Sequence, residues 1–128
     1  MKLLLDTHAF IWWTEGHSRL PVRVAEAIRD PANTVRLSLA SVWEMQIKVQ
    51  LGKLQLSWPL PRLIQLEEAA NNVRLLAITR EDIFALHSLP PIHRDPFDRI
   101  IAAQTMRGDF KLVSHDPVMT DYGLSVLW

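Results

Sequence analysis

Four acidic residues each stand where an apolar, strand-like run meets a helix or a turn: Asp6, Glu44, Asp98 and Asp116. Two of them, Asp6 and Asp116, closely follow such a run, and the other two fall near the starts of expected helices. The carboxyl ends of parallel strands share one edge of a sheet, and open α/β proteins bind their ligands at that edge. We therefore expect the four carboxylates to converge on one site.

A cluster of carboxylates in this chain predicts a hard metal ion. Carboxylates that are brought together repel one another, so the cluster requires a shared proton or a bound cation. The chain has no cysteine, which excludes a disulfide framework and a thiolate metal site. The remaining oxygen and imidazole ligands favour magnesium or manganese over structural zinc. Magnesium held by a few carboxylates commonly serves phosphate chemistry.

Three of these acids also have a structural explanation. Asp6 can cap the helix that follows it, and Asp116, which precedes Pro117, suits a turn. Glu44 precedes Lys48 by four residues, a spacing at which a Glu–Lys pair adds only about 0.2–0.5 kcal/mol to an exposed helix. The alternative is that Glu44 faces the cleft, where Lys48 holds it or meets a phosphate. Local explanations account for each acid separately but do not predict their common place at the edge of a sheet.

Two further aspartates compete with the four. Asp95 precedes Pro96, which suits an N-cap followed by a first-turn proline, so we assign it mainly to capping. Asp98 is then the third residue of the helix and could reach back as in a capping box, but we assign it mainly to the site. Asp121 precedes Tyr122 in an expected exposed turn and is left out of the site.

The elements that must position these residues alternate between strands and helices. Apolar runs predict strands at residues 2–5, 34–37, 73–78, 110–114 and 124–127. Capping residues, prolines and glycines delimit helices over residues 7–14, 22–29, 62–71 and 80–89, with one more between Ser38 or Ser41 and Gly52 and another between Asp95 and Gly108. This alternation predicts an α/β fold with a parallel sheet.

Length and composition fit one domain over residues 1–128. With 48% apolar residues the chain can bury a real core. No window approaches the length of a membrane span, and the first apolar run is far shorter than that of a signal peptide, so we expect a cytoplasmic protein with no membrane partner. Fourteen basic residues balance fourteen acidic ones, which removes the overall positive charge of proteins that hold nucleic acid by charge alone. If the protein acts on nucleic acid, metal ions and a local basic rim must attract it.

Segments spread along the chain together resemble a known family: Leu4–Trp13, Ser38–Lys48 with Leu51–Leu54, Leu89–Gln104 and Leu112–Asp116. In order and spacing they resemble the PIN-domain nucleases, and more narrowly the VapC-type toxin ribonucleases of bacterial type II toxin–antitoxin systems. The resemblance covers nearly the whole chain. It implies a three-layer α/β/α sandwich with a parallel central sheet.

The resemblance also implies an activity. The acidic quartet of Asp6, Glu44, Asp98 and Asp116 would be catalytic and would hold one or two Mg²⁺ or Mn²⁺ ions. The protein would be a metal-dependent endoribonuclease, a hydrolase in which a metal-activated water attacks the phosphodiester bond of RNA. General-base duty would fall to that hydroxide or to a carboxylate.

Residues beside the quartet receive supporting roles. Thr7 and Ser114 are expected to orient a carboxylate or a water, and Lys48 to hold Glu44 or meet a phosphate. Arg99 is expected either to contact RNA or to neutralise the cluster. His93 precedes a helix, where a histidine is more often a structural hydrogen-bond donor than a catalyst.

The resemblance further implies protein partners. These are a second copy of the chain in a homodimer and a cognate antitoxin that blocks the metal cleft, often with a basic group; a larger toxin–antitoxin assembly stays open. Trp12 and Trp13 are adjacent, so a helix cannot bury both on one narrow stripe. One of them can belong to an interface, although packing in the core is the favoured interpretation for the pair.

Two other classes compete with a nuclease. A non-enzymatic receiver-like signalling or binding module also clusters acids around magnesium, but it needs two acids near the end of the first strand and a lysine after a late strand. Here Asp6 is alone and no suitable lysine follows. A phosphatase of the haloacid-dehalogenase kind needs a second aspartate two residues after the first, where this chain has His8.

Overall fold

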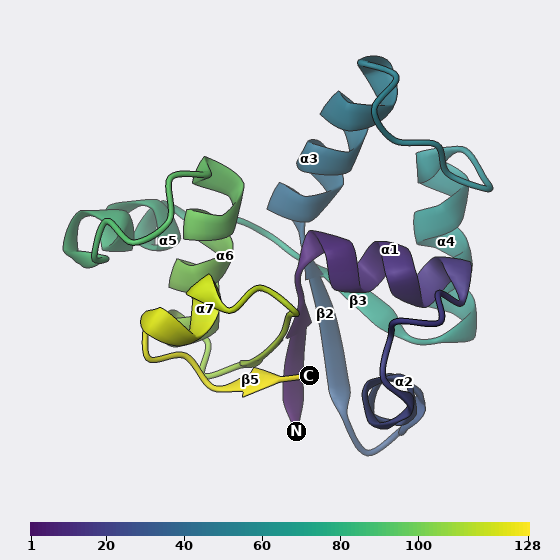
Figure 1. The fold of residues 1–128 in the computed structure, drawn as a ribbon, viewed down its shortest axis with the longest axis horizontal. Coiled ribbons are helices and arrows are strands. Elements are labelled where there is room, and N and C mark those ends of the chain that lie inside the picture. The colour runs from purple at the N-terminus through teal and green to yellow at the C-terminus, as the bar shows by residue number, and fades with distance from the viewer.

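A five-stranded parallel sheet runs through the molecule (Figure 1). The structure is a computed structural model and describes all residues from 1 to 128. Its strands are β1 (Lys2–Leu5), β2 (Thr34–Ser38), β3 (Val73–Leu76), β4 (Lys111–Val113) and β5 (Val126–Leu127). Their order across the sheet is β3-β2-β1-β4-β5, and every pairing is parallel. The predicted parallel α/β sheet is therefore confirmed, with β1 at its centre.

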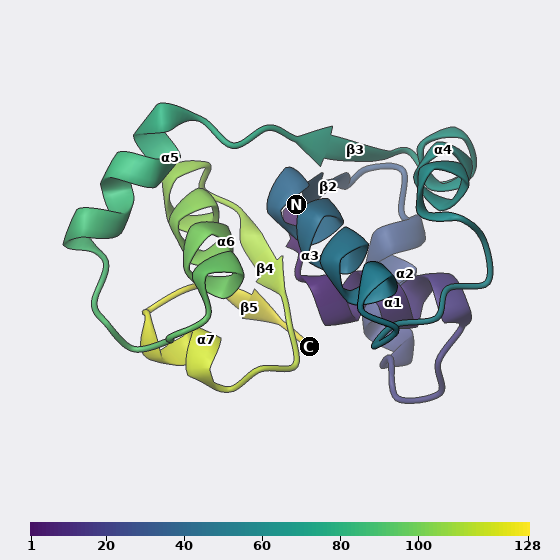
Figure 2. The ribbon, with the colours of Figure 1, turned by 90° about the horizontal axis from the view of Figure 1, so that it is seen from above.

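Helices cover both faces of the sheet. They are α1 (Thr7–Glu15), α2 (Val22–Arg29), α3 (Leu39–Gln50), α4 (Leu60–Ala70), α5 (Arg80–Ala85), α6 (Pro96–Arg107) and α7 (Val118–Asp121). Viewed from above, α1, α2 and α4 lie on one side of the strands and α5, α6 and α7 on the other (Figure 2). Helix α3 extends beyond the carboxyl end of β2 (Figure 1). The expected three-layer α/β/α sandwich is confirmed.

The central strand is apolar because both of its faces are covered. Leu3 and Leu5 pack in the core cluster that contains residues of α1, α2 and α4, whereas Leu4 packs in the cluster that contains residues of α6 and α7. All three leucines are fully buried. Successive side chains of a strand point to opposite faces, so a doubly covered strand reads as a continuous apolar run. The run ends at Asp6, on the edge of the sheet.

Several boundaries differ from the sequence-based ones. The expected helix over residues 80–89 ends at Ala85 and tightens into a 3₁₀ turn, Leu86–Ser88, ahead of Pro90, because a residue before a proline avoids helical angles. Helix α4 begins earlier than expected, since Pro61 lies in its first turn, where the missing N–H leaves no bond unmade. The turn expected after Asp116 continues into α7, whose Met119 N–H donates to the carbonyl of Asp116.

Membrane insertion finds no support in the helices, since none combines the length and the apolar character needed to cross a bilayer.

Candidate functional site

Asp6 lies at the carboxyl end of the central strand and begins the site. Its Oδ1 accepts a hydrogen bond from the backbone N–H of Ala9 at 2.7 Å, so it caps α1 as the local pattern predicts. The side chain is buried, and this burial raises the pKa of Asp6 above its ordinary value. Hydrogen bonds from Ser114 and Ala9 oppose that rise, and the negative charge of Asp116 adds to it. Asp6 is thus both a helix cap and a member of an acidic group.

Glu44 reaches the same edge from α3 and is held by its neighbours. The Thr7 hydroxyl donates to Glu44 Oε1 at 2.6 Å, and Lys48 Nζ donates to Oε2 at 2.8 Å. The hydroxyl of Ser41 lies 3.0 Å from that of Thr7. Glu44 is buried, whereas Lys48 is partly exposed. The helical ion pair expected from the spacing is present, and its carboxylate also contacts the first residue of α1.

Asp98 and Asp116 meet across one imidazole. His93 Nε2 lies 3.1 Å from Asp98 Oδ2 and 3.1 Å from Asp116 Oδ2. His93 Nδ1 accepts the backbone N–H of Asp95 at 3.2 Å, so the proton of a neutral ring sits on Nε2 and is donated to Asp116. The other carboxylate oxygen of Asp116, Oδ1, accepts the backbone N–H of Val118 at 2.9 Å, which also fixes this side chain.

The charge of Asp98 is poorly compensated. Burial raises the pKa of Asp98 to about 7, and the negative charges of Asp95, Glu44 and Asp6 push in the same direction, while His93 opposes them. The side chain therefore senses three other carboxylates. Such a group holds its proton near neutral pH unless a cation replaces that proton.

A short loop presents His93, and the side chains of Tyr122 and Arg99 hold this loop. The backbone N–H of His93 donates to the Tyr122 hydroxyl at 2.7 Å. The guanidinium of Arg99 donates to backbone carbonyls of Leu86, Leu89 and Pro90, at 3.3, 3.4 and 3.0 Å. The guanidinium of Arg99 therefore hydrogen-bonds backbone carbonyls and forms no ion pair with a carboxylate of the site.

The structure places the remaining residues named in the sequence analysis, Asp95, Ser114 and Asp121, in three different settings. Asp95 is the N-cap of α6 and accepts the N–H groups of Phe97 at 2.8 Å and Asp98 at 3.3 Å, so its capping assignment is confirmed. Ser114 is buried, its side chain hydrogen-bonds Asp6, and its Oγ accepts the N–H of Asp116 at 3.0 Å. Asp121 is exposed at the end of α7.

His93 has a larger part in this geometry than the sequence analysis gave it. The spacing of His93, Asp95 and Asp98 could have predicted the contact between His93 and Asp98. Asp95 is the N-cap of α6, and His93, two residues before it, folds back toward Asp98, the third residue of the helix. The contact with Asp116 has no local signal. It exists only because α6 and β4 lie side by side in the fold.

The ligand set fits a hard divalent cation. His93 Nε2 and carboxylate oxygens of Asp98 and Asp116 all lie within 4.8 Å of one another, and the charges of Asp6 and Glu44 act on Asp98. His93 would bind a cation only after losing the proton on Nε2. Oxygen donors dominate this group and no sulfur is present, which is the donor chemistry of magnesium and manganese. Burial, with smaller effects from neighbouring negative charges, raises the pKa of Asp6 and of Asp98, so a bound cation would favour the ionised forms of both side chains.

Comparison with known proteins identifies the family of this chain. Residues 3–123 match the PIN domain family. Over 115 residues the chain is 30% identical to Ribonuclease VapC22 of Mycobacterium tuberculosis (strain ATCC 25618 / H37Rv), a match that spans 89% of this chain and 86% of that protein.

Solved structures share the fold at lower sequence identity. A VapBC2 structure from Rickettsia felis, bound to a DNA fragment from their promoter, has a TM-score of 0.74 at 14% identity and covers 99% of this chain and 98% of that one. FitAcB from Neisseria gonorrhoeae and a toxin–antitoxin complex from Klebsiella pneumoniae have TM-scores of 0.64 and 0.63, each at 16% identity and covering 98% of this chain and 96% of the other. The chain belongs to the PIN-domain family and, within it, to the ribonucleases of VapC type.

Proposed function

We propose that this PIN-domain protein is a Mg²⁺- or Mn²⁺-dependent endoribonuclease that acts as the toxin of a toxin–antitoxin pair. The observation that carries the proposal is the group of His93, Asp98 and Asp116 within 4.8 Å, on which Asp6 and Glu44 act through their charges, with burial raising the pKa of Asp98 to about 7. A partly buried acidic group with raised pKa values favours a cation-dependent reaction over a purely structural role. Family membership favours a nuclease over the receiver-like and phosphatase alternatives.

The four acids would hold the cation. When bound, a divalent ion at such a site lowers the pKa of water and stabilises negative charge on the phosphoryl oxygens. The chain's own part is to fix the ligands in advance. Asp6 is fixed by Ala9 and Ser114, and Glu44 by Thr7 and Lys48. Fixed ligands need no reorganisation during the reaction, which is the main advantage of a preorganised site.

Asp98 is the ligand whose protonation state must change. With a pKa of about 7 it holds a proton much of the time at neutral pH in the absence of a cation. Binding a cation requires the ionised carboxylate, so binding releases that proton. The Nε2–H of His93 donates to Asp116 and lies close to Asp98, and so helps to position both carboxylates.

Names of the relatives support the substrate and the partner. Ribonuclease VapC22 is named for cleavage of RNA, which supports RNA as the substrate here. The similar structures are VapBC2, FitAcB and a complex of toxin with antitoxin, which supports a cognate antitoxin as the partner. An antitoxin that places a basic side chain at the acidic site would neutralise the same charge that a cation does. We also propose a homodimer.

Sequencing of RNA ends after brief induction in cells tests the proposal. New 5′ ends at defined positions are expected with the wild-type chain and not with Asp98→Asn. The matched control is Asp121→Asn, which removes an exposed acid outside the site and should cleave as the wild type does. Purified wild-type protein should cut the same RNA with Mg²⁺ or Mn²⁺ and stop when EDTA is added. Equal cleavage by wild type and Asp98→Asn, or cleavage that EDTA leaves intact, would contradict the proposal.

A further inference from the structure

Beside the acidic site lies a group of four rings, Trp12, His17, His115 and Trp128, which we call the aromatic cluster. His17 stacks on Trp12 with ring centroids 4.6 Å apart and planes inclined by 11°. Trp128 lies 5.7 Å from Trp12 and 5.1 Å from His115, and His115 lies 5.9 Å from Trp12. Offset and tilted rings at these separations attract one another, so the cluster is a preformed unit.

The topology places this cluster next to the carboxylates. His115 stands between Ser114 and Asp116, just after β4, and Trp128 follows β5, the strand paired with β4. Trp12 lies on α1, the helix that Asp6 caps. Parallel strands end at the same edge, and neighbouring strands are about 4.8 Å apart. The rings therefore extend the edge that holds the acids, on the side of β5.

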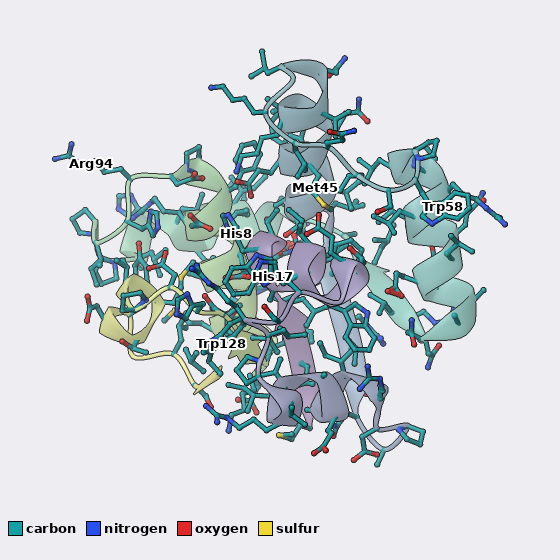
Figure 3. All side chains as sticks on the ribbon, turned by 45° about the vertical axis from the view of Figure 1, so that its right-hand side comes forward. His8, His17, Met45, Trp58, Arg94 and Trp128 are labelled. Carbon is teal, nitrogen blue, oxygen red and sulfur yellow. The ribbon has the colours of Figure 1, made fainter.

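The rings are anchored on one side and open on the other. Trp12 and Trp128 are half-buried and pack against the core, whereas His115 is exposed. Arg23 donates from Nε to the Trp128 carbonyl at 2.9 Å, and the N–H of Arg19 donates to His17 Nδ1 at 3.0 Å, so both ends are tied to the chain. In Figure 3 His17 and Trp128 lie near each other between α1 and β5, and Trp58 lies on the opposite flank beside α4. The cluster therefore exposes His115 and parts of the other three rings.

Because the chain has no net positive charge, a nuclease of this kind needs contacts other than general charge attraction to hold RNA. The chain has a formal net charge of zero, so general attraction of phosphates is weak. Proteins that bind single strands also stack bases on aromatic rings, and this contact tolerates different sequences because every base has a flat face. A protein partner would also accept apolar rings, but continuity with the acids favours the substrate that those acids act on.

We propose that the aromatic cluster is a base-stacking platform that holds single-stranded RNA beside the cleaved phosphodiester bond; this inference rests on the proposed function of the acidic site. A base continues the existing stack of rings, and its backbone then passes the strand edge where Asp116 and Asp6 lie. The platform binds the nucleotides next to the reaction, and it takes no part in the bond cleavage itself.

Binding of short oligoadenylate to protein carrying Asp98→Asn tests the platform without cleavage. Adding Trp128→Leu keeps an apolar side chain and the carbonyl that Arg23 contacts, but it removes the ring. We expect the dissociation constant to rise about 5- to 150-fold, the range that corresponds to the loss of one base–ring stack. Adding Trp128→Phe should recover most of the affinity, and adding His115→Ala should weaken binding less than Trp128→Leu does.

Two controls isolate stacking. Adding Trp58→Leu removes an exposed tryptophan from the opposite flank and should leave affinity unchanged. An abasic ribose-phosphate chain of the same length should bind weakly, and equally to all variants. In the cleaving protein, which retains Asp98, Trp128→Leu should raise KM with kcat within about twofold of the wild type.

The outcomes separate this inference from the proposed function. If wild-type protein cleaves RNA but Trp128→Leu and His115→Ala bind oligoadenylate as the unsubstituted background does, the platform is overturned and the rings remain available to a protein partner. Abasic RNA that binds as tightly as oligoadenylate overturns it as well. If wild-type protein fails to cleave any RNA while Trp128→Leu still weakens binding, the nuclease proposal fails and the stacking surface stands.

Discussion

Two buried acidic regions of this molecule satisfy their charge in opposite ways. Asp82, in the first turn of α5, is surrounded by donors from its own chain. The group formed by Asp6, Glu44, Asp98 and Asp116 is surrounded partly by other acids. Asp82, Asp6 and Asp98 all lie at or near the start of a helix, and in the sequence all three look like ordinary capping positions.

Donors compensate Asp82 fully. It forms a capping box with Thr79, and its carboxylate accepts Gln104 Nε2 at 3.3 Å and Arg107 Nε at 3.1 Å. Burial pushes its pKa upward, but the hydrogen bonds from Thr79, Gln104 and Arg107 outweigh that effect and lower the pKa below its ordinary value. The folded chain thus prefers the ionised form of Asp82.

The sheet edge has the reverse balance, because burial and neighbouring acids raise the pKa of Asp6 and of Asp98. We infer from this difference that the fold uses Asp82 for its own stability. The acids at the sheet edge, whose ionised forms the chain disfavours, are the better candidates for holding a cation.

Cleavage should separate the two regions most strongly. We expect Asp6→Asn and Asp98→Asn each to lower kcat/KM for RNA about 100- to 1000-fold, because loss of a cation ligand removes several kcal/mol of transition-state stabilisation. Asp82→Asn should stay within about twofold of the wild type when assayed well below its unfolding temperature, since it lies outside the acidic site. Initial rates on one RNA substrate in Mg²⁺ make this measurement. A loss of activity in Asp82→Asn as large as that in Asp98→Asn would remove the distinction.

Stability should move in opposite directions. Asp82→Asn should lower the free energy of unfolding by about 1–2 kcal/mol, because it weakens the cap and the contact with the partly exposed Arg107. In EDTA at pH 8, Asp98→Asn should raise that free energy, because it removes a charge that burial and neighbouring acids disfavour. Urea unfolding of the two variants and the wild type measures both changes. A destabilised Asp98→Asn with an unchanged slope against urea would show that the carboxylate is compensated after all.

The pH dependence should show the same contrast. Between the ordinary Asp pKa of 3.8 and about 7, folded Asp98 keeps a proton that the unfolded chain has released. The free energy of unfolding of metal-free protein should therefore fall as pH rises through that window, and Asp6 should add to the fall. The lowered pKa of Asp82 acts below this window, where its stabilisation is lost as pH falls.

Thermal unfolding in EDTA from pH 4.5 to pH 8 measures this slope. Asp98→Asn should flatten it. Saturating Mg²⁺ should also remove the fall, because the cation binds the ionised carboxylates, and an excess of about 10 times Kd adds about 1.4 kcal/mol. A slope that is the same in wild type and Asp98→Asn would contradict the raised pKa of Asp98.

The smallest effect is expected at Lys48. Lys48→Gln removes the ion pair with Glu44, which at this helical spacing contributes only about 0.2–0.5 kcal/mol. The Thr7 hydroxyl continues to hold the other carboxylate oxygen. Chemical unfolding should detect at most this small loss, and RNA cleavage should fall less than about fivefold. A drop comparable to that of Asp6→Asn would instead give Lys48 a direct role with the RNA phosphate.

The amino-acid sequence determined much of this fold through local physical chemistry. The run Leu3–Leu5 has the continuous apolar character of a doubly covered strand, and Thr79, Asp95 and Ser38 cap their helices as their side chains predict. Alternation of strands and helices then restricts the sheet to parallel pairings. The strand-end positions of Asp6 and Asp116 follow from the same patterns.

Only the tertiary structure decided how the acids differ from one another. His93 bridges Asp98 and Asp116 because α6 and β4 come together in space, and Arg99 turns to the loop carbonyls instead of the acids. A pKa depends on burial and on charges from distant parts of the chain, which no local pattern contains. For that reason Asp82 and Asp98, both near the start of a helix, acquire opposite properties only once the chain has folded.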